Sequence, residues 1–164
     1  MQTTNKDRAG WKLQALLGWI LFSFLAPLPS AFLDTPYSWY DTLLKPGIVP
    51  PGWVFSLVWL NLYFFMGLAA YLVARSASSE SFKNRALLLF IVQLVVNSAF
   101  NPVFFGWQSL SGGLLIIALL IIIVALTTRM FWQISLPAGI IFTFYLLWLL
   151  FAFYLNVSIF ILNS

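Results

Sequence analysis

The chain has 164 residues, of which 62% are hydrophobic and only 7% are charged, and its net charge at neutral pH is +4. A soluble domain of this size carries about a quarter charged residues, so the composition excludes an ordinary water-soluble domain and indicates a membrane protein. The eight Lys and Arg residues form no basic patch, which argues against nucleic acid as a partner.

The first apolar run covers residues 11–33 and contains Pro27 and Pro29 near its end. A secretory signal is the alternative interpretation, because a positively charged segment precedes the run. The run is too long for the apolar part of a signal peptide, and no clear cleavage site follows it. We therefore predict a first membrane span here.

An aromatic and proline-rich loop is predicted over residues 34–51. It ends in Pro50 and Pro51, which remove two backbone donors and favour a helix that starts directly afterwards. Four further apolar runs follow at 52–74, 85–105, 110–131 and 136–162. Each is close to the ~20 residues that cross a membrane as a helix, and continuous runs do not fit period-two barrel strands.

These runs predict an all-α integral membrane protein with a bundle of five transmembrane helices. Residues 1–164 would form a single domain, in which residues 34–51 are a lid over one end. Seven of the eight basic residues then fall on one side of the membrane and only Lys45 on the other. The seven are Lys6, Arg8, Lys12, Arg75, Lys83, Arg85 and Arg129.

The distribution of positive charge predicts a cytoplasmic N-terminus and a C-terminus on the outer side. An odd number of spans requires the termini to lie on opposite sides, so the span count and the charge bias agree. The sequence shows no clear transit peptide, which favours a bacterial inner membrane over an organelle.

Three of the runs carry aromatic and polar side chains at helical spacing, which predicts faces turned toward the bundle interior. The faces are Phe55, Trp59, Tyr63 and Met66 in the second run; Gln93, Asn97 and Asn101, with Phe100 beside them, in the third; and Tyr145, Trp148, Ala152 and Asn156 in the fifth. Aromatic walls with a few amides are typical of a site for a flat apolar ligand. The alternative is structural, with amides that join helices and rings that fill the core.

Conventional catalytic chemistry has no candidate in this sequence. Neither His nor Cys occurs, and the four acidic residues are scattered. The usual axial ligands of haem iron are therefore missing, and no zinc or di-iron site is expected. We find no phosphate-binding glycine loop, nucleophile elbow or metalloprotease motif. We expect no metal site and no required cofactor.

Several of these blocks are similar to the translocator protein family, also called tryptophan-rich sensory proteins or peripheral-type benzodiazepine receptors. The blocks are Trp39-Tyr40, Leu44-Lys45-Pro46, Pro50-Pro51, Trp53-Val54-Phe55 and residues 59–63; then Gln93-Leu94, Asn97 and residues 102–106; then Tyr145-Leu146, Trp148, Ala152, Leu155 and Asn156. Four elements depart from the family pattern. The chain has Ile48-Val49 where members usually carry a Trp before the double proline, Phe100-Asn101 where they often have Trp followed by Thr or Ser, and Phe144 where they usually have Pro. No Lys or Arg follows Tyr154 to complete the cholesterol-recognition pattern.

The resemblance implies a five-helix bundle, frequently a homodimer in the membrane lipid, that binds porphyrins such as protoporphyrin IX and, in animals, cholesterol. It implies a pocket of Trp59, Tyr63, Asn97, Phe100, Trp148 and Ala152, closed by Trp39, Tyr40 and Pro46 of the loop. We expect a tetrapyrrole as ligand and a sensory or receptor role. The alternatives are light-dependent porphyrin degradation through oxidation of Trp59 or Trp148, and passive transport of a tetrapyrrole or sterol-like cargo.

Overall fold

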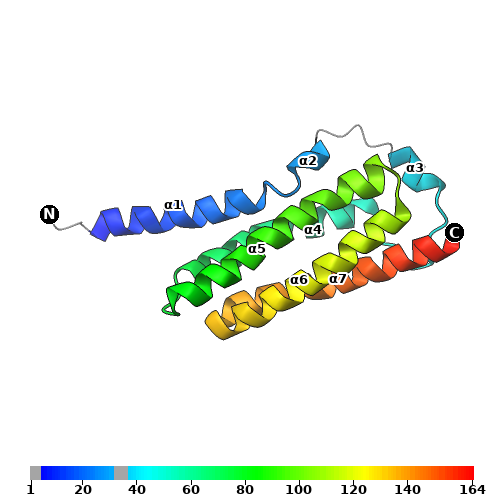
Figure 1. The fold of residues 1–164 in the computed structure, drawn as a ribbon. Coiled ribbons are helices and arrows are strands. Elements are labelled where there is room, and N and C mark those ends of the chain that lie inside the picture. Colours follow the sequence, from blue (N-terminus) through cyan, green and yellow to red (C-terminus); the bar gives the residue numbers. More distant parts are fainter. Residues whose placement is uncertain (1–4, 32–36) are drawn as a thin grey trace.

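The computed structural model describes residues 5–31 and 37–164 of the chain (Figure 1). All regular structure in these residues is helical, which confirms the predicted all-α class. The elements are α1 (Asn5–Ser23), α2 (Leu28–Ala31), α3 (Tyr37–Thr42), α4 (Gly52–Ala74), α5 (Glu80–Asn101), the π-helical turn η1 (Pro102–Gly106), α6 (Leu110–Ile134) and α7 (Leu136–Leu162).

Four helical segments in the described part of the chain are long and apolar enough to cross a membrane. Helices α4 and α7 have the predicted bounds, and α6 continues to Ile134. Helix α5 and η1 form one segment over 80–106, which begins five residues before the predicted start at Arg85. Glu80 in the first turn of α5 favours this earlier start, because a carboxylate is stabilised at the positive end of the helix dipole.

The predicted first span, residues 11–33, is not one continuous helix. Helix α1 ends at Ser23, turns follow, and α2 is a separate helix of four residues. Pro27 explains the break, because it has no N–H for the Ser23 carbonyl and its ring disfavours helical geometry at Ala26. The apolar part of α1, Lys12–Ser23, is too short to be a candidate span by itself, so a five-helix count is not confirmed.

The predicted lid is partly helical, because it contains α3. Residues 32–36, which hold the end of the predicted first span and the start of the predicted loop, lie outside the described residues. We call residues 37–51 the lid segment. It packs on η1, with the Trp39 ring centroid 5.6 Å from that of Phe104 and the Tyr40 centroid 5.7 Å from that of Phe105.

The solid core of the bundle lies between α4, α5, α6 and α7, toward the end far from α3 (Figure 1). Met66, Phe90, Phe131, Phe142 and Tyr145 are fully buried there. The centroids of Phe131 and Phe142 are 4.5 Å apart. The outer surfaces of the long helices are instead apolar and exposed, as expected for helices that face lipid.

Helix α1 packs on α4 at a point where only glycine fits. A Cβ atom added to Gly67 would lie 2.5 Å from the Ile20 Cα atom, so a larger residue would push the two helices apart. The Ser23 hydroxyl, 2.6 Å from the Tyr63 carbonyl oxygen, donates a hydrogen bond across the same contact. This contact holds the end of α1 against the middle of α4.

Candidate functional site

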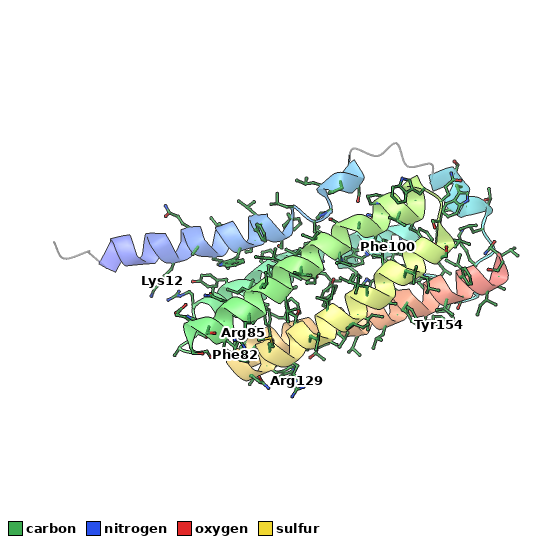
Figure 2. All side chains as sticks on the ribbon, in the orientation of Figure 1. Lys12, Phe82, Arg85, Phe100, Arg129 and Tyr154 are labelled. Atoms are coloured by element: carbon green, nitrogen blue, oxygen red, sulfur yellow. The ribbon has the colours of Figure 1, made fainter. Side chains whose placement is uncertain are left out.

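A cavity of about 510 Å³ lies between α4, α5, α6 and α7, at the end of the bundle that the lid segment covers. Most of its lining is apolar, and seven of the lining residues are aromatic: Tyr40, Phe55, Trp59, Tyr63, Phe100, Phe104 and Phe105. The polar residues in the lining are Asp41, Ser56, Asn97, Asn101 and Asn156. Figure 2 labels Phe100 in this half of the bundle.

Two stacked pairs of rings form parts of the cavity wall. On α4, Trp59 stacks on Tyr63, with centroids 5.7 Å apart and an interplanar angle of 28°. Across the junction of α5 and η1, Phe100 stacks on Phe104 at 5.3 Å and 13°. Each pair is separated by four residues, which places both rings on one side of a helix.

The π-helical turn places the second pair. Pro102 has no N–H and cannot continue the bonding of α5, and the Trp107 N–H instead bonds the Pro102 carbonyl oxygen at 2.9 Å. Gly113 of α6 leaves room for the ring of Phe104, because a Cβ atom at this position would lie 2.5 Å from Phe104 Cδ2. The wider turn and the missing side chain together bring Phe104 into the wall of the cavity.

A chain of buried hydrogen bonds joins the cavity to the solid core. The Tyr63 hydroxyl donates to Asn97 Oδ1 at 2.8 Å, and Asn97 Nδ2 donates to the Tyr145 hydroxyl oxygen at 3.1 Å. The Tyr145 hydroxyl in turn donates to Gln93 Oε1 at 3.1 Å. Asn97 lines the cavity, whereas Gln93 is fully buried and not in the lining. Gln93 therefore joins helices, and Asn97 combines this role with a place in the wall.

Six of the nine residues predicted to contact a ligand line the cavity, namely Tyr40, Trp59, Tyr63, Asn97, Phe100 and Ala152. Trp39, Pro46 and Trp148 are outside the lining. Trp39 packs on Phe104 from the lid segment, and Trp148 contacts Phe55 and Phe151, each with centroids 5.5 Å apart. The structure thus brings most of the predicted set together, and the binding roles of all nine stay predictions.

Sequence reasoning missed several lining residues. Phe104 and Phe105 belong to the matched block at residues 102–106, whose Pro102 was the available signal for an irregular end of the helix. Ile117 and Leu120 of α6 also line the cavity. No signal could have found them, because the run at 110–131 is apolar nearly throughout and shows no inward face.

The lid segment is hydrogen-bonded to the C-terminal end of the chain. The Leu44 N–H donates to Asn163 Oδ1 at 3.0 Å, and Asn163 Nδ2 donates to the Leu44 carbonyl oxygen at 3.0 Å. Asn163 Nδ2 also lies 2.7 Å from the Ile159 carbonyl oxygen, which orients the amide on α7. We call this pair of bonds between Leu44 and Asn163 the lid clasp.

One cation and one carboxylate lie beside Tyr40 of the cavity wall. We call the part of the lining around the exposed Asp41 side chain the cavity mouth. Lys45 Nζ is 4.5 Å from the centroid of the Tyr40 ring and 3.8 Å from Asp41 Oδ1. Partial burial, with a smaller contribution from the negative charge of Asp41, raises the pKa of the Tyr40 phenol. Tyr40 therefore stays a neutral hydrogen-bonding group at neutral pH. Among the residues the structure describes, no group of three His, Cys, Asp or Glu side chains comes together to hold a metal ion.

Comparison with known proteins places the chain in a family. The model of the TspO/MBR family matches residues 13–162. The tryptophan-rich protein TspO of Chlorobaculum tepidum is 41% identical over 135 residues, covering 82% of this chain and 85% of that protein. Protein CrtK of Rhodobacter capsulatus is 37% identical over 129 residues, covering 79% and 81%. The translocator protein of Ovis aries is 37% identical over 142 residues, covering 80% and 82%. With its apolar helices, the chain is an integral membrane protein that belongs to the TspO/MBR family.

Proposed function

We propose that this protein binds a tetrapyrrole in the cavity beneath the lid segment and acts as a membrane sensor or regulator of porphyrin handling. The observation that carries the proposal is the cavity itself, which has a volume of about 510 Å³ and a mainly aromatic and aliphatic lining. Sites for small organic ligands span about 300–1,000 Å³ and combine such walls with a few polar groups. The name "tryptophan-rich sensory protein", given to a relative that is 39% identical, supports the sensory part of the proposal.

The arrangement of the rings favours a flat ligand. Trp59 on α4 and Phe100 on α5 each extend their aromatic surface by stacking on a neighbour four residues away. A macrocycle that enters the cavity gains contact with these rings over its broad faces. Asn97 and Tyr63 then offer an amide and a hydroxyl to polar groups at its edge.

The ligand is expected to bind without coordination of a metal. The sequence contains neither His nor Cys, which are the commonest protein ligands of haem iron. Metal-free protoporphyrin IX should therefore bind at least as tightly as haem, because stacking and burial contribute equally to both.

We also propose the membrane arrangement that the charge distribution predicts. In it, α1 and α2 together form a fifth crossing, the N-terminus is cytoplasmic, the C-terminus is outside and the membrane is a bacterial inner membrane. The start of α1 and the end of α7 lie at opposite ends of the bundle (Figure 1), and Lys12, Arg85 and Arg129 lie at the end far from α3 (Figure 2). The homodimer implied by the family remains part of this proposal.

The orientation can be tested because the chain has no Cys. A Ser164→Cys variant in intact cells should react with a maleimide that does not cross the membrane. Protection of this thiol until the cells are opened would reverse the proposed orientation.

The binding proposal predicts that filling the cavity removes the site. Ala152 of α7 lines the cavity, so Ala152→Phe should place a ring in the space that the ligand needs. We expect protoporphyrin IX affinity, measured by quenching of tryptophan fluorescence in detergent, to fall at least about tenfold, which equals about 1.4 kcal/mol.

Leu147→Phe is the matched control on the same helix, because the Leu147 side chain is 56% exposed on the outer surface. It should leave protoporphyrin affinity unchanged. Equal affinities of the wild type and Ala152→Phe would contradict binding in this cavity. Much tighter binding of haem than of protoporphyrin IX would contradict the metal-independent form of the proposal.

A further inference from the structure

We propose that Lys45 determines which ligands the cavity accepts, by binding a carboxylate on the edge of the ligand at the cavity mouth. The inference rests on the proposed function and specifies its ligand class. That class is a flat aromatic ring with one acidic edge, such as a tetrapyrrole that carries two carboxylic acid side chains. A carboxylate bound by Lys45 also fixes the orientation of the ligand, with the acidic edge toward the lid segment and the uncharged edge toward Asn97.

The charges of the cavity lining support this orientation. Among the described lining residues, Asp41 is the only one with a charged side chain, and no Lys or Arg is present. The other polar residues of the lining are neutral, and of these Asn97 is buried. A carboxylate placed beside them would lose its hydration without gaining a cation, which is costly. The acidic edge of a ligand should therefore stay at the mouth.

Lys45 is the basic residue placed to meet that edge. It is the only Lys or Arg of the sequence between Lys12 and Arg75. Its ammonium nitrogen lies 4.5 Å from the centroid of the Tyr40 ring, and Tyr40 is part of the cavity wall. The Lys45 side chain is only 25% exposed, so it lies against the lid segment instead of extending into solvent.

The ion pair between Lys45 and Asp41 is weak. The distance from Lys45 Nζ to Asp41 Oδ1 is 3.8 Å, longer than a hydrogen bond, and the Asp41 side chain is 79% exposed. Such an exposed ion pair contributes about 0.2–1 kcal/mol at most sites. A ligand carboxylate at the mouth can replace Asp41, because the water-exposed Asp41 side chain is free to move away.

The backbone beside Lys45 is held in place by the lid clasp. Both the N–H and the carbonyl group of Leu44, the preceding residue, bond to the Asn163 side chain on α7. The ammonium group therefore starts from a fixed point relative to the cavity wall. A ligand loses less free energy to ordering when the group that binds it is already in place.

The test compares two ligands that share one ring system. Protoporphyrin IX carries two carboxylates, and its dimethyl ester carries none. Affinities are measured by fluorescence quenching in nanodiscs of zwitterionic lipid, for the wild type and for Lys45→Gln, Asp41→Asn and Lys12→Gln. The last variant is the matched control, because Lys12 is exposed and lies at the other end of the bundle (Figure 2).

Lys45→Gln should lower the affinity for the diacid about fivefold, the equivalent of one exposed ion pair. It should leave the affinity for the ester unchanged. Asp41→Asn should tighten binding of the diacid, because it removes a competing negative charge. Lys12→Gln should change the affinity for neither ligand. Raising the salt concentration should reduce the preference of the wild type for the diacid over the ester.

Three outcomes would overturn the inference. Equal diacid affinities of the wild type and Lys45→Gln would remove Lys45 from recognition while the proposed function still stood on the binding of both ligands. An equal loss for the diacid and the ester would show that Lys45 acts through the lid structure and not through its charge. Failure of the wild type to bind either ligand would overturn both the inference and the proposed function.

Discussion

The two ends of the bundle are built from the same kinds of residue but differ in how completely they are filled. At the end far from α3, Phe90, Phe131 and Phe142 meet directly, and all three are fully buried. At the lid end, Trp59 and Phe100 each stack on a neighbour along their own helical segment and leave a cavity of about 510 Å³ beside them. A high aromatic content is therefore compatible both with a solid core and with a cavity.

The backbone accounts for much of the difference. At the solid end, rings of α5, α6 and α7 converge from three helices. At the lid end, α5 changes to the π-helical turn at Pro102, and α7 contributes the small residue Ala152 to the wall. The lid segment then covers the remaining space with Tyr40 and Pro50. The π-helical turn, the small residue Ala152 and the lid segment thus distinguish the hollow end from the solid end.

The largest expected effect is on stability and comes from a substitution at the solid end. Phe131→Ala should lower the free energy of unfolding by about 3 kcal/mol, because it opens a void among rings that cannot collapse into it. Phe100→Ala should cost about 1 kcal/mol, because its ring already borders a cavity. Reversible unfolding in mixed detergent micelles measures both. Equal losses for the two variants would contradict the distinction between a solid end and a hollow end.

A smaller effect is expected when the lid clasp is removed, and it concerns the rate at which the ligand dissociates. Asn163→Ala removes both bonds to Leu44, and each such bond contributes about 0.5–1.5 kcal/mol. The ligand should dissociate about fivefold faster, measured by stopped-flow fluorescence. The free energy of unfolding should fall by about 1–2 kcal/mol, because both bonds are exposed to solvent.

The control for the clasp is Asn61→Ala, because the Asn61 amide is exposed and bonds the Leu57 carbonyl oxygen of its own helix. It should not change the dissociation rate. If Asn163→Ala also left this rate unchanged, the clasp would have no role in retaining the ligand, although the cavity could still bind it.

Local sequence patterns predicted the long helices well. An uninterrupted apolar run bounded by polar or proline residues leaves few alternatives in a membrane, and α4 and α7 have the predicted bounds for this reason. The bounds of the first run were harder to predict. The run is largely apolar, but Pro27 lies within it and divides it into α1 and α2. Composition predicts that such a segment is buried in lipid, but it does not predict where its backbone turns.

The candidate site was predictable to the extent that it lies on helical faces. Spacing along α4 and α5 placed Trp59, Tyr63 and Asn97 on inward faces, and all three line the cavity. The same reasoning placed Trp148 inward on α7. The structure packs its ring on Phe55, a residue of the cavity wall on α4, while Trp148 itself is outside the lining. A one-dimensional pattern cannot show which neighbouring helix a large ring meets. The lid clasp joins residues 119 positions apart and has no local signal at all.

The central claim is that the hollow end binds a flat aromatic ligand, and the two interior tryptophans test it most directly. Trp59 lines the cavity and Trp148 does not, although the spacing of both predicted a place in the pocket. Titration of protoporphyrin IX should give an affinity at least about tenfold weaker for Trp59→Ala, because the ligand loses a stacking surface, and within about twofold of the wild type for Trp148→Ala. Weakening by Trp148→Ala that equals or exceeds the weakening by Trp59→Ala would contradict the account.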